Sequence, residues 1–305
     1  MYQFSFQPYQ RTFKQPLQTS HGTWKIREGI ILSLTDNFGK TSWGEIAPIS
    51  WFGSETFTQA LNYCRQLPTE ITTETIYSIP DLLPACQFGF ESAIGANKNQ
   101  NYNSLTYSGL LPAGKAALQQ WGKLWAQDYR TFKWKIGVYP IAEELEIFAE
   151  FTHSLPALAK LRLDANGGLT YDEAKLWLYL CDRTKIIEFI EQPLGVEQLE
   201  QILELSKLYK TAIALDESVA TFNQLQACYQ EGWRGIFVIK PSIIGFPSRL
   251  REFCQKYNID AVFSSAFETE IGRKAALNLA VELANPNRAV GFGIDNFLSP
   301  DTARI

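Results

Sequence analysis

A strand-then-helix pattern repeats through the last two thirds of this chain and leaves few folds open to it. Short apolar or β-branched runs recur roughly every 25 residues, and segments of helical periodicity lie between them. The eight runs are LTYSGLL (105–111), FKWKIG (132–137), KLRLDANG (160–167), IIEFIEQP (186–193), TAIALDES (211–218), GIFVIKPS (235–242), DAVFSSAF (260–267) and AVGFGI (289–294). Because repeated strand–helix units give parallel strands, eight of them predict a closed (β/α) barrel. The same strand–helix repeat is also compatible with an open, doubly wound sheet.

The residues before this repeat follow another pattern. Two strand-like runs, a turn sequence and two helical stretches follow one another at residues 2–8, 29–34, 35–39, 55–66 and 82–97. Strands followed by helices indicate a separate α+β unit that begins as an antiparallel meander. We therefore predict two domains, one over residues 1–103 and one over residues 104–295.

Composition places the chain among folded globular proteins and excludes two classes of function. Hydrophobic residues make up 46% of the chain, and 28 Lys and Arg against 32 Asp and Glu give a net charge of −4. Nucleic-acid binding needs a basic excess, and membrane spanning needs an apolar run of about 20 residues, neither of which is present. The N-terminus lacks the apolar core of a signal peptide, so we expect a cytoplasmic protein. The choice between monomer and homo-oligomer stays open.

The sequence offers little for nucleophilic or zinc chemistry. Its five cysteines are scattered without a C-x-x-C pair, and its two histidines are His21 and His153. Neither a zinc site nor a disulfide framework is indicated, and a mechanism built on a histidine base is disfavoured. We interpret the cysteines as buried free thiols.

Charged residues interrupt the apolar strands at corresponding places. Strands covered by helices on both faces are expected to be almost wholly apolar. A charged side chain nevertheless stands at or near the end of five successive strands, namely Lys135 with Lys133, then Asp164, Glu191, Asp216 and Lys240. The gaps of 29, 27, 25 and 24 residues each span one strand–helix unit. If the strands lie in register, these side chains meet at the carboxyl-terminal mouth of the barrel, where the active sites of this fold lie.

The order of these charged residues has chemical meaning. Three carboxylates on adjacent strands form the hard oxygen set that Mg²⁺ prefers. Lysines flank this set, and desolvation together with a neighbouring cation favours the neutral form of a lysine. Lys135 can then take a proton from a carbon acid while a bound metal stabilises the resulting enediolate. The alternative is a set of ion pairs that cap strand ends, but five such residues at successive ends favour a functional site.

The chain resembles the enolase superfamily in a series of short motifs. They are SWGEIAPIS, KWKIG, LRLDANGG, IEFIEQP, ALDES, IKPS and SSAFETEIG. Their order and spacing are most similar to the o-succinylbenzoate synthase family of the muconate-lactonising subgroup, over nearly the whole chain. The resemblance implies a modified (β/α)7β TIM-like barrel with an N-terminal α+β capping domain, to which residues 296–305 return.

The resemblance also implies roles for individual residues. The ligands of Mg²⁺, for which Mn²⁺ can substitute, would be Asp164, Glu191 and Asp216. Lys135 would be the base, Lys133 would orient it and favour its neutral form, and Lys240 would be a cation on the opposite face of the substrate. The small carboxylate substrate would be contacted by Arg162, Asn166, Ser264, Ser265, Gly291 and Gly293. The loops around Ser20–Trp24 and Ser50–Ser54 would close over the site.

The implied reaction is the dehydration of 2-succinyl-6-hydroxy-2,4-cyclohexadiene-1-carboxylate to o-succinylbenzoate, a step toward menaquinone or phylloquinone. Racemisation of N-acylamino acids, epimerisation of dipeptides and cycloisomerisation of muconate are alternatives within the superfamily, because a fold does not fix the substrate. The compact chain favours the synthase, as does the segment FSSAFETE at 263–270, which lacks the D-x-D expected of a dipeptide epimerase. Outside enzymology, the alternative is a catalytically silent barrel that serves as a binding protein.

Overall fold

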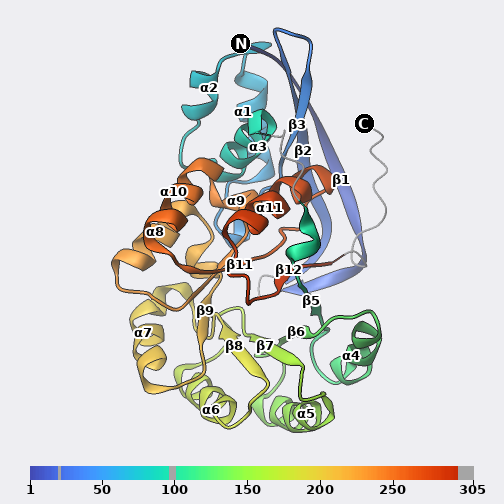
Figure 1. Ribbon diagram of the computed structural model, residues 1–305, viewed down its shortest axis with the longest axis vertical. Coiled ribbons are helices and arrows are strands. Elements are labelled where there is room, and N and C mark those ends of the chain that lie inside the picture. Colours follow the sequence, from blue (N-terminus) through green and yellow to red (C-terminus); the bar gives the residue numbers. More distant parts are fainter. Residues whose placement is uncertain (20–21, 96–100, 295–305) are drawn as a thin grey trace.

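The computed structural model describes residues 1–19, 22–95 and 101–294 of the chain, which form a sheet-and-helix unit above a barrel (Figure 1). The predicted boundary at residue 103 precedes the first barrel strand and stays a prediction of where two folding units separate. The predicted return of residues 296–305 to the cap lies outside the described residues. In the part of the chain that is described, no helix is both long and apolar enough to cross a membrane.

The N-terminal sheet is antiparallel and is built on one long hairpin. Its strands, in the spatial order β3-β2-β1-β4, are β1 (Tyr2–Thr19), β2 (Gly22–Asp36), β3 (Thr41–Ile46) and β4 (Glu70–Ile71). The predicted meander is confirmed, but β1 and β2 extend well beyond the apolar runs at 2–8 and 29–34. The reason is long-range packing, since Phe13 in the distal half of the hairpin packs on Trp24 and on Phe267 of the barrel.

Three α-helices cover one face of this sheet. The helical elements of the cap are η1 (Ser50–Phe52), α1 (Phe57–Gln66), α2 (Thr73–Tyr77) and α3 (Pro84–Gly95), and η2 (Tyr102–Ser104) leads to the barrel. The two predicted helices correspond to α1 and α3. Helix α1 begins where it does because Thr56 and Gln59 form a reciprocal capping box. Helix α3 is buried along most of its length, which fits its apolar sequence.

The second unit contains all eight predicted strands. They are β5 (Tyr107–Leu110), β6 (Thr131–Lys135), β7 (Lys160–Asp164), β8 (Ile187–Glu191), β9 (Ile213–Leu215), β10 (Ile236–Ile239), β11 (Asp260–Phe263) and β12 (Val290–Gly293). The intervening helices are α4 (Ala116–Ala126), α5 (Ile141–Ser154), α6 (Tyr171–Cys181), α7 (Leu199–Leu208), α8 (Phe222–Gln230), α10 (Pro247–Tyr257) and α11 (Glu270–Leu283). Shorter helical turns are η3 (Val196–Gln198), η4 (Glu217–Val219) and α9 (Pro241–Ile244).

These strands close into a barrel in sequence order. The sheet runs β11-β10-β9-β8-β7-β6-β5-β12 with parallel neighbours, and a parallel bridge between Ser264 and Gly291 joins its two edges. One main helix follows each of the first seven strands, so the fold is a (β/α)7β barrel. The closed barrel is confirmed, and the open doubly wound sheet is excluded.

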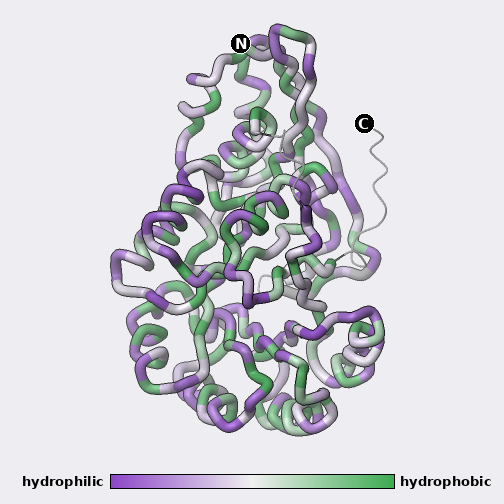
Figure 2. The backbone as a smooth tube through the Cα atoms, viewed as in Figure 1, coloured by the Kyte–Doolittle hydropathy of each residue, from purple (hydrophilic) through white to green (hydrophobic). Residues whose placement is uncertain are grey.

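The barrel is held by apolar packing inside and outside its strands. Phe189, Val238 and Val262 belong to a small cluster of interior side chains, and Trp134 and Trp177 are fully buried between strands and helices. Hydrophobic and hydrophilic residues alternate around the outer helices α5, α6 and α7, as expected for helices with one buried face (Figure 2). The five cysteines are buried and free, as predicted.

The cap docks on the barrel through buried polar contacts as well as apolar ones. The carboxylate of Glu45 on β3 accepts hydrogen bonds from the backbone N–H groups of Thr269 and Gly272 at the start of α11 (both 2.9 Å). Arg27 on β2 is fully buried and donates to the carbonyl oxygen of Ala266 (3.1 Å). The two contacts place β2 and β3 of the cap beside the carboxyl ends of the barrel strands.

Candidate functional site

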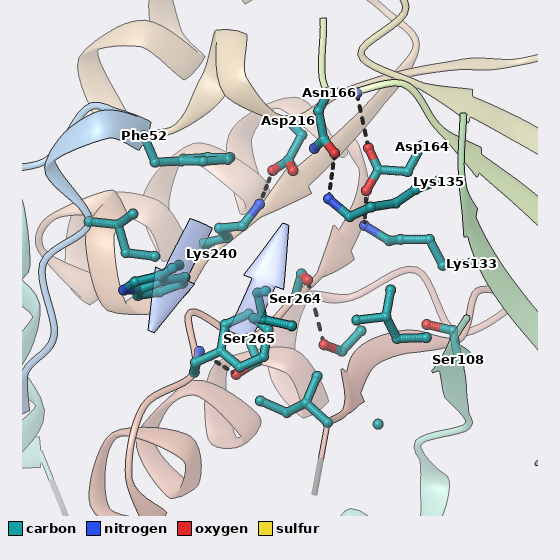
Figure 3. A pocket seen from close by; sticks show the side chains of 18 of the residues that line it. Phe52, Ser108, Lys133, Lys135, Asp164, Asn166, Asp216, Lys240, Ser264 and Ser265 are labelled. Atoms are coloured by element: carbon teal, nitrogen blue, oxygen red, sulfur yellow. Dashed lines mark hydrogen bonds and ion pairs between the residues drawn. The ribbon is translucent and has the colours of Figure 1, made fainter. Parts of the chain in front are cut away.

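A cavity opens at the carboxyl-terminal mouth of the barrel, beneath the cap (Figure 3). Its polar wall comes from strand ends and the loops after them: Ser108, Lys133, Lys135, Asp164, Asn166, Asp216, Lys240, Ser264 and Ser265. Its apolar wall comes largely from the cap: Leu17, Trp24, Ile49, Trp51, Phe52, Leu110, Phe267 and Ile294. Gly291 and Gly293 complete the lining. The cavity therefore belongs to both units of the molecule.

The charged residues of the successive strand ends converge here as the spacing predicts. Lys135 on β6 is in register with Asp164 on β7, which is in register with Glu191 on β8. Asp216 and Lys240 directly follow β9 and β10. Glu191 does not line the cavity itself, because its side chain lies behind the ammonium group of Lys133. The convergence follows from parallel register, since each residue stands at the same end of its strand.

The lysines pair with the carboxylates around this cavity. Lys133 Nζ lies 2.6 Å from Glu191 Oε1 and 3.3 Å from Asp164 Oδ2, so it bridges the two acids. Lys240 forms an ion pair with Asp216, and its ammonium group lies 3.9 Å from the centroid of the Phe52 ring. The Phe52 contact ties the loop after β3 to the barrel through a cation–π interaction.

Lys135 has a different kind of partner. Its Nζ donates to the side-chain oxygen of Asn166 at 2.6 Å, and Asn166 Nδ2 donates to Glu217 Oε1 at 3.0 Å. Lys133, which we expected to orient Lys135, contacts the acids Asp164 and Glu191 instead. The neighbour that fixes the Lys135 amine is therefore an uncharged amide on the next strand end.

Burial and mutual charge shift the ionisation of this group. Burial raises the pKa of Glu191 to about 8, with a lowering contribution from Lys133, and burial also raises the pKa of Asp216. Burial alone would raise the pKa of Asp164 as well, but Lys133 and Lys135 outweigh it and hold that pKa below its ordinary value. Burial would lower the pKa of Lys133, yet the carboxylates raise it. Burial thus makes Glu191 and Asp216 harder to ionise than ordinary carboxyl groups, although lysines lie beside them.

The donor set fits a hard divalent cation. Among the described residues, Glu191 Oε2 has no hydrogen-bond partner although it is buried, which is costly unless a cation or another donor compensates. Among the residues that the structure describes, no three acids already converge on one point, because Lys133 Nζ stands between Asp164 and Glu191. All three carboxylates are nevertheless buried at adjacent strand ends, which is the oxygen-only arrangement that Mg²⁺ favours.

The structure brings most of the predicted substrate-binding residues to the cavity. Ser264, Ser265, Gly291 and Gly293 line it, as does Asn166. At Gly291 an added Cβ would lie 2.7 Å from Ser264 Oγ, so glycine permits the close approach of β11 and β12 that closes the barrel here. Ser264 and Ser265 lie across the cavity from the charged strand ends, whereas Asn166 lies among those ends (Figure 3).

Arg162 is the exception, because the structure does not place it at the cavity. Its Nε donates to Glu188 Oε2 at 2.7 Å, and its guanidinium lies 4.8 Å from the centroid of the Phe189 ring. Arg162 and Asp164 have the same strand parity, so both point into the barrel, but Arg162 lies one layer deeper. The predicted contact of Arg162 with substrate or metal stays a prediction, which this placement does not support.

The lid loops are placed only in part. Trp24, Trp51 and Phe52 line the cavity, as the prediction for the two loops requires. Ser20 and His21 lie outside the described residues. The aromatic rings of Trp24, Trp51 and Phe267 form an edge-to-face series with centroids 5.5–5.6 Å apart, which makes one continuous wall.

Sequence reasoning missed several residues of this site. Phe267, Gln192 and Glu217 each lie within motifs that were noted, SSAFETEIG, IEFIEQP and ALDES, but none was singled out. A signal was available for Glu217 and Gln192. Each is an acid or amide that directly follows a predicted metal ligand, Asp216 or Glu191. Phe267 gave no such signal, since its backbone φ of 59° appears only in the structure.

Two family models match this chain. The model of enolase C-terminal domain-like proteins matches residues 116–301, and that of the MenC N-terminal domain matches residues 1–96. A curated o-succinylbenzoate synthase from Thermosynechococcus vestitus is 40% identical over 299 residues, which cover 95% of this chain and 92% of that protein. One from Geobacillus kaustophilus is 26% identical, covering 89% of this chain and 78% of that protein.

Solved structures agree with these sequence matches. The o-succinylbenzoate synthase of Thermosynechococcus elongatus BP-1, complexed with Mg in the active site, has a TM-score of 0.91 and 39% identity, covering 97% of this chain and 94% of that one. The L-Ala-D/L-Glu epimerase of Bacillus subtilis has a TM-score of 0.82 at 20% identity, covering 98% and 91%, and shows a shared fold alone. The fold is that of the enolase superfamily. Within it, the chain belongs to the o-succinylbenzoate synthase family.

Proposed function

We propose that this protein converts 2-succinyl-6-hydroxy-2,4-cyclohexadiene-1-carboxylate to o-succinylbenzoate and water. The observation that carries the proposal is the convergence of Lys133, Lys135 and Lys240 with the buried acids Asp164 and Asp216 on one cavity, with Glu191 paired to Lys133 behind it, in a chain 40% identical to a curated synthase. Proton removal from a carbon acid needs a base and a charged environment for the resulting anion, and this cavity offers both.

Asp164, Glu191 and Asp216 would hold a Mg²⁺ ion, for which Mn²⁺ can substitute. Support comes from their burial at adjacent strand ends and from the unpartnered Glu191 Oε2. Binding the cation requires Lys133 to leave the position between Asp164 and Glu191 that it takes here. When bound, the cation would supply positive charge beside the substrate carboxylate whose α-carbon loses its proton.

Lys135 would act as the base, in its neutral form. Its lone pair takes the proton from the carbon α to the ring carboxylate, and the electron pair of the broken C–H bond stays on the substrate. The C–O bond to the ring hydroxyl then breaks, and that hydroxyl leaves as water with the proton returned by Lys135. Lys240, which pairs with Asp216 here, would lie on the opposite face of the substrate and stabilise the anion between these two steps.

The remaining walls would select the substrate. A ring-bearing substrate fits the aromatic series of Trp24, Trp51 and Phe267, which also excludes water from the reaction. The hydroxyl groups of Ser264 and Ser265, with the backbone of Gly291 and Gly293, would receive the succinyl carboxylate. This polar wall faces the charged strand ends, so a dicarboxylate can span the cavity between them.

A steady-state assay tests this proposal. Turnover of the cyclohexadiene substrate is followed with Mg²⁺ and with a chelator, and N-succinylamino acids are assayed in parallel. We expect metal-dependent aromatisation and a loss of about 10²–10⁴-fold in kcat for Lys135→Ala. The matched control is Lys123→Ala, an exposed lysine of α4 outside the cavity. Racemisation without aromatisation would reject the substrate assignment, and silence on both substrates would reject the enzyme.

A further inference from the structure

Glu217 is an acid that the proposed reaction leaves without a task. It follows Asp216 in the turn after β9, is half-buried, and does not line the cavity. One of its carboxylate oxygens, Oε1, accepts the hydrogen bond from Asn166 Nδ2 at 3.0 Å. The other, Oε2, is buried and has no hydrogen-bond partner in the part of the chain that the structure describes. Burying a carboxylate oxygen without a partner costs folding free energy, so a role of this acid toward its neighbour is worth examining.

That neighbour is the residue that holds Lys135. Asn166 accepts the hydrogen bond from Lys135 Nζ at 2.6 Å, so the three side chains form a series from the β9 turn to the cavity. The backbone of Asn166 is fixed as well, because its N–H donates to Asp164 Oδ1 at 3.2 Å. Its φ of 44° lies in the left-handed region, which asparagine tolerates better than most residues.

A lysine base needs such a holder. Its four-carbon stem is flexible, and only one lone pair of the neutral amine can take a proton. Fixing one N–H on Asn166 Oδ1 restricts where that lone pair points. A base misplaced by a single ångström can cost about 100-fold in rate.

The carboxylate of Glu217 decides which end of the Asn166 amide faces Lys135. A carboxylate only accepts hydrogen bonds, so it selects the NH₂ end and leaves the carbonyl oxygen for the lysine. If the amide turned over, its NH₂ group would donate to the Lys135 lone pair and block the base. Its oxygen would then face the Glu217 carboxylate, which is repulsive.

We infer that Glu217 and Asn166 are positioning residues for Lys135: Glu217 fixes the orientation of the Asn166 amide, and the amide aims the lone pair of the base. The inference rests on the proposed function, because it assigns an orienting pair to the base of that reaction. Neither residue exchanges a proton with the substrate, and the bonds made and broken stay those given above.

A double-mutant cycle tests this chain of contacts. The variants are Glu217→Met, Asn166→Ala and the double substitution, assayed on the cyclohexadiene substrate with saturating Mg²⁺. We expect each single change to lower kcat by about 10²-fold, with KM nearly unchanged. Because Glu217 acts through Asn166, Glu217→Met should cause little further loss in the Asn166→Ala background. Independent, multiplying losses would overturn the inference.

Three further measurements separate positioning from damage to the fold or to the metal site. Substrate deuterated at the α-carbon should show a larger isotope effect in Glu217→Met than in the wild type, because proton removal becomes slower. Glu217→Gln, which keeps an acceptor oxygen, should recover most of kcat. Calorimetric Mg²⁺ titration should give an affinity close to that of the wild type, and an affinity loss as large as the kcat loss would overturn the inference.

A control variant and two further outcomes distinguish failure of the inference from failure of the proposed function. Glu91→Met removes another buried carboxylate, one that accepts from Ser248 outside the cavity, and should lower stability without lowering kcat. Wild-type activity in Glu217→Met would reject the positioning pair and leave the proposed function standing. An inactive wild type would reject the proposed function itself.

Discussion

At the scale of single residues, Gln192 ties together the strand ends that carry the acids. It follows Glu191 and is fully buried. Its backbone φ of 38° is one that residues other than glycine rarely adopt. Its side-chain oxygen accepts from the N–H groups of Asp216 (3.0 Å) and Ser218 (3.2 Å), and its NH₂ group donates to Leu194 O and Ser218 Oγ. All hydrogen-bonding positions of the amide are used, so no other side chain of this size can replace it.

We predict that Gln192→Met lowers the free energy of unfolding by about 2–4 kcal/mol, because it leaves two buried N–H groups without acceptors. It should also weaken Mg²⁺ binding, since Asp216 is no longer held. Urea unfolding and calorimetric titration measure the two effects. The control is Gln201→Met, at an exposed glutamine that accepts a hydrogen bond from Gln198. It should change the free energy of unfolding by less than about 0.5 kcal/mol. Equal stability of both variants would contradict the prediction.

At the scale of elements, the cap depends on the close approach of α3 to β3. An added Cβ at Gly89 in α3 would lie 2.8 Å from the carbonyl oxygen of Glu45 and 2.8 Å from Ile46 Cγ1. Glycine in the middle of a helix disfavours the helix by itself. Its presence here is explained by the packing of helix backbone on strand backbone, which leaves no room for a side chain.

Gly89→Ala is therefore expected to destabilise the protein by about 1–3 kcal/mol through overpacking, although alanine is the better helix former. The matched control is Gly122→Ala in α4, where an added Cβ meets nothing within 4 Å. That change should stabilise the protein by about 0.5–1 kcal/mol. Melting temperatures by calorimetry should move in opposite directions, and a shift of the same sign in both variants would refute the packing argument.

At the scale of the whole molecule, a charge network closes the barrel at the end opposite the cavity. Glu188 on β8 accepts hydrogen bonds from Arg162 on β7 and from Arg288, which precedes β12 (2.7 and 3.0 Å). Arg288 also binds Asp260 at the start of β11 (2.8 and 2.6 Å). The network joins strands on opposite sides of the barrel, so Arg162 contributes to barrel closure.

This network predicts a pH dependence of stability. Burial alone would raise the pKa of Asp260, but hydrogen bonds from Arg288 and Asn285 outweigh it and hold the pKa below its ordinary value. A lowered pKa in the folded state means that this carboxylate stabilises the fold above the unfolded pKa of about 4. The contribution is lost as pH falls through the folded-state pKa.

Asp260→Asn should accordingly lower the free energy of unfolding by about 1–3 kcal/mol at pH 7, and the difference from the wild type should shrink below about pH 4. Urea unfolding at a series of pH values measures this difference. Asp128→Asn, at an ion pair whose acid is 90% exposed, is the control and should change little at any pH. A difference that is constant with pH would contradict the role of Asp260.

The sequence by itself determined the parallel strands and the placing of charged residues at their ends. Strand–helix periodicity predicts parallel strands whose carboxyl ends lie at one edge of the sheet, so Asp164, Glu191 and Asp216 had to stand at adjacent strand ends. These are consequences of backbone geometry, which repeats along the chain and can be read locally. The cap could be predicted as a meander with helices for the same reason.

Only the tertiary structure decided how the gathered residues are used. Strand parity predicts that Arg162 and Asp164 both point inward. Only their depth in the barrel shows that Arg162 takes part in barrel closure and that Asp164 lines the cavity. The partner of Lys135 is Asn166 rather than Lys133, and the wall formed by Trp24 and Phe267 joins segments far apart in the chain. Such pairings are set by long-range packing and by competition among buried charges, which no local pattern encodes.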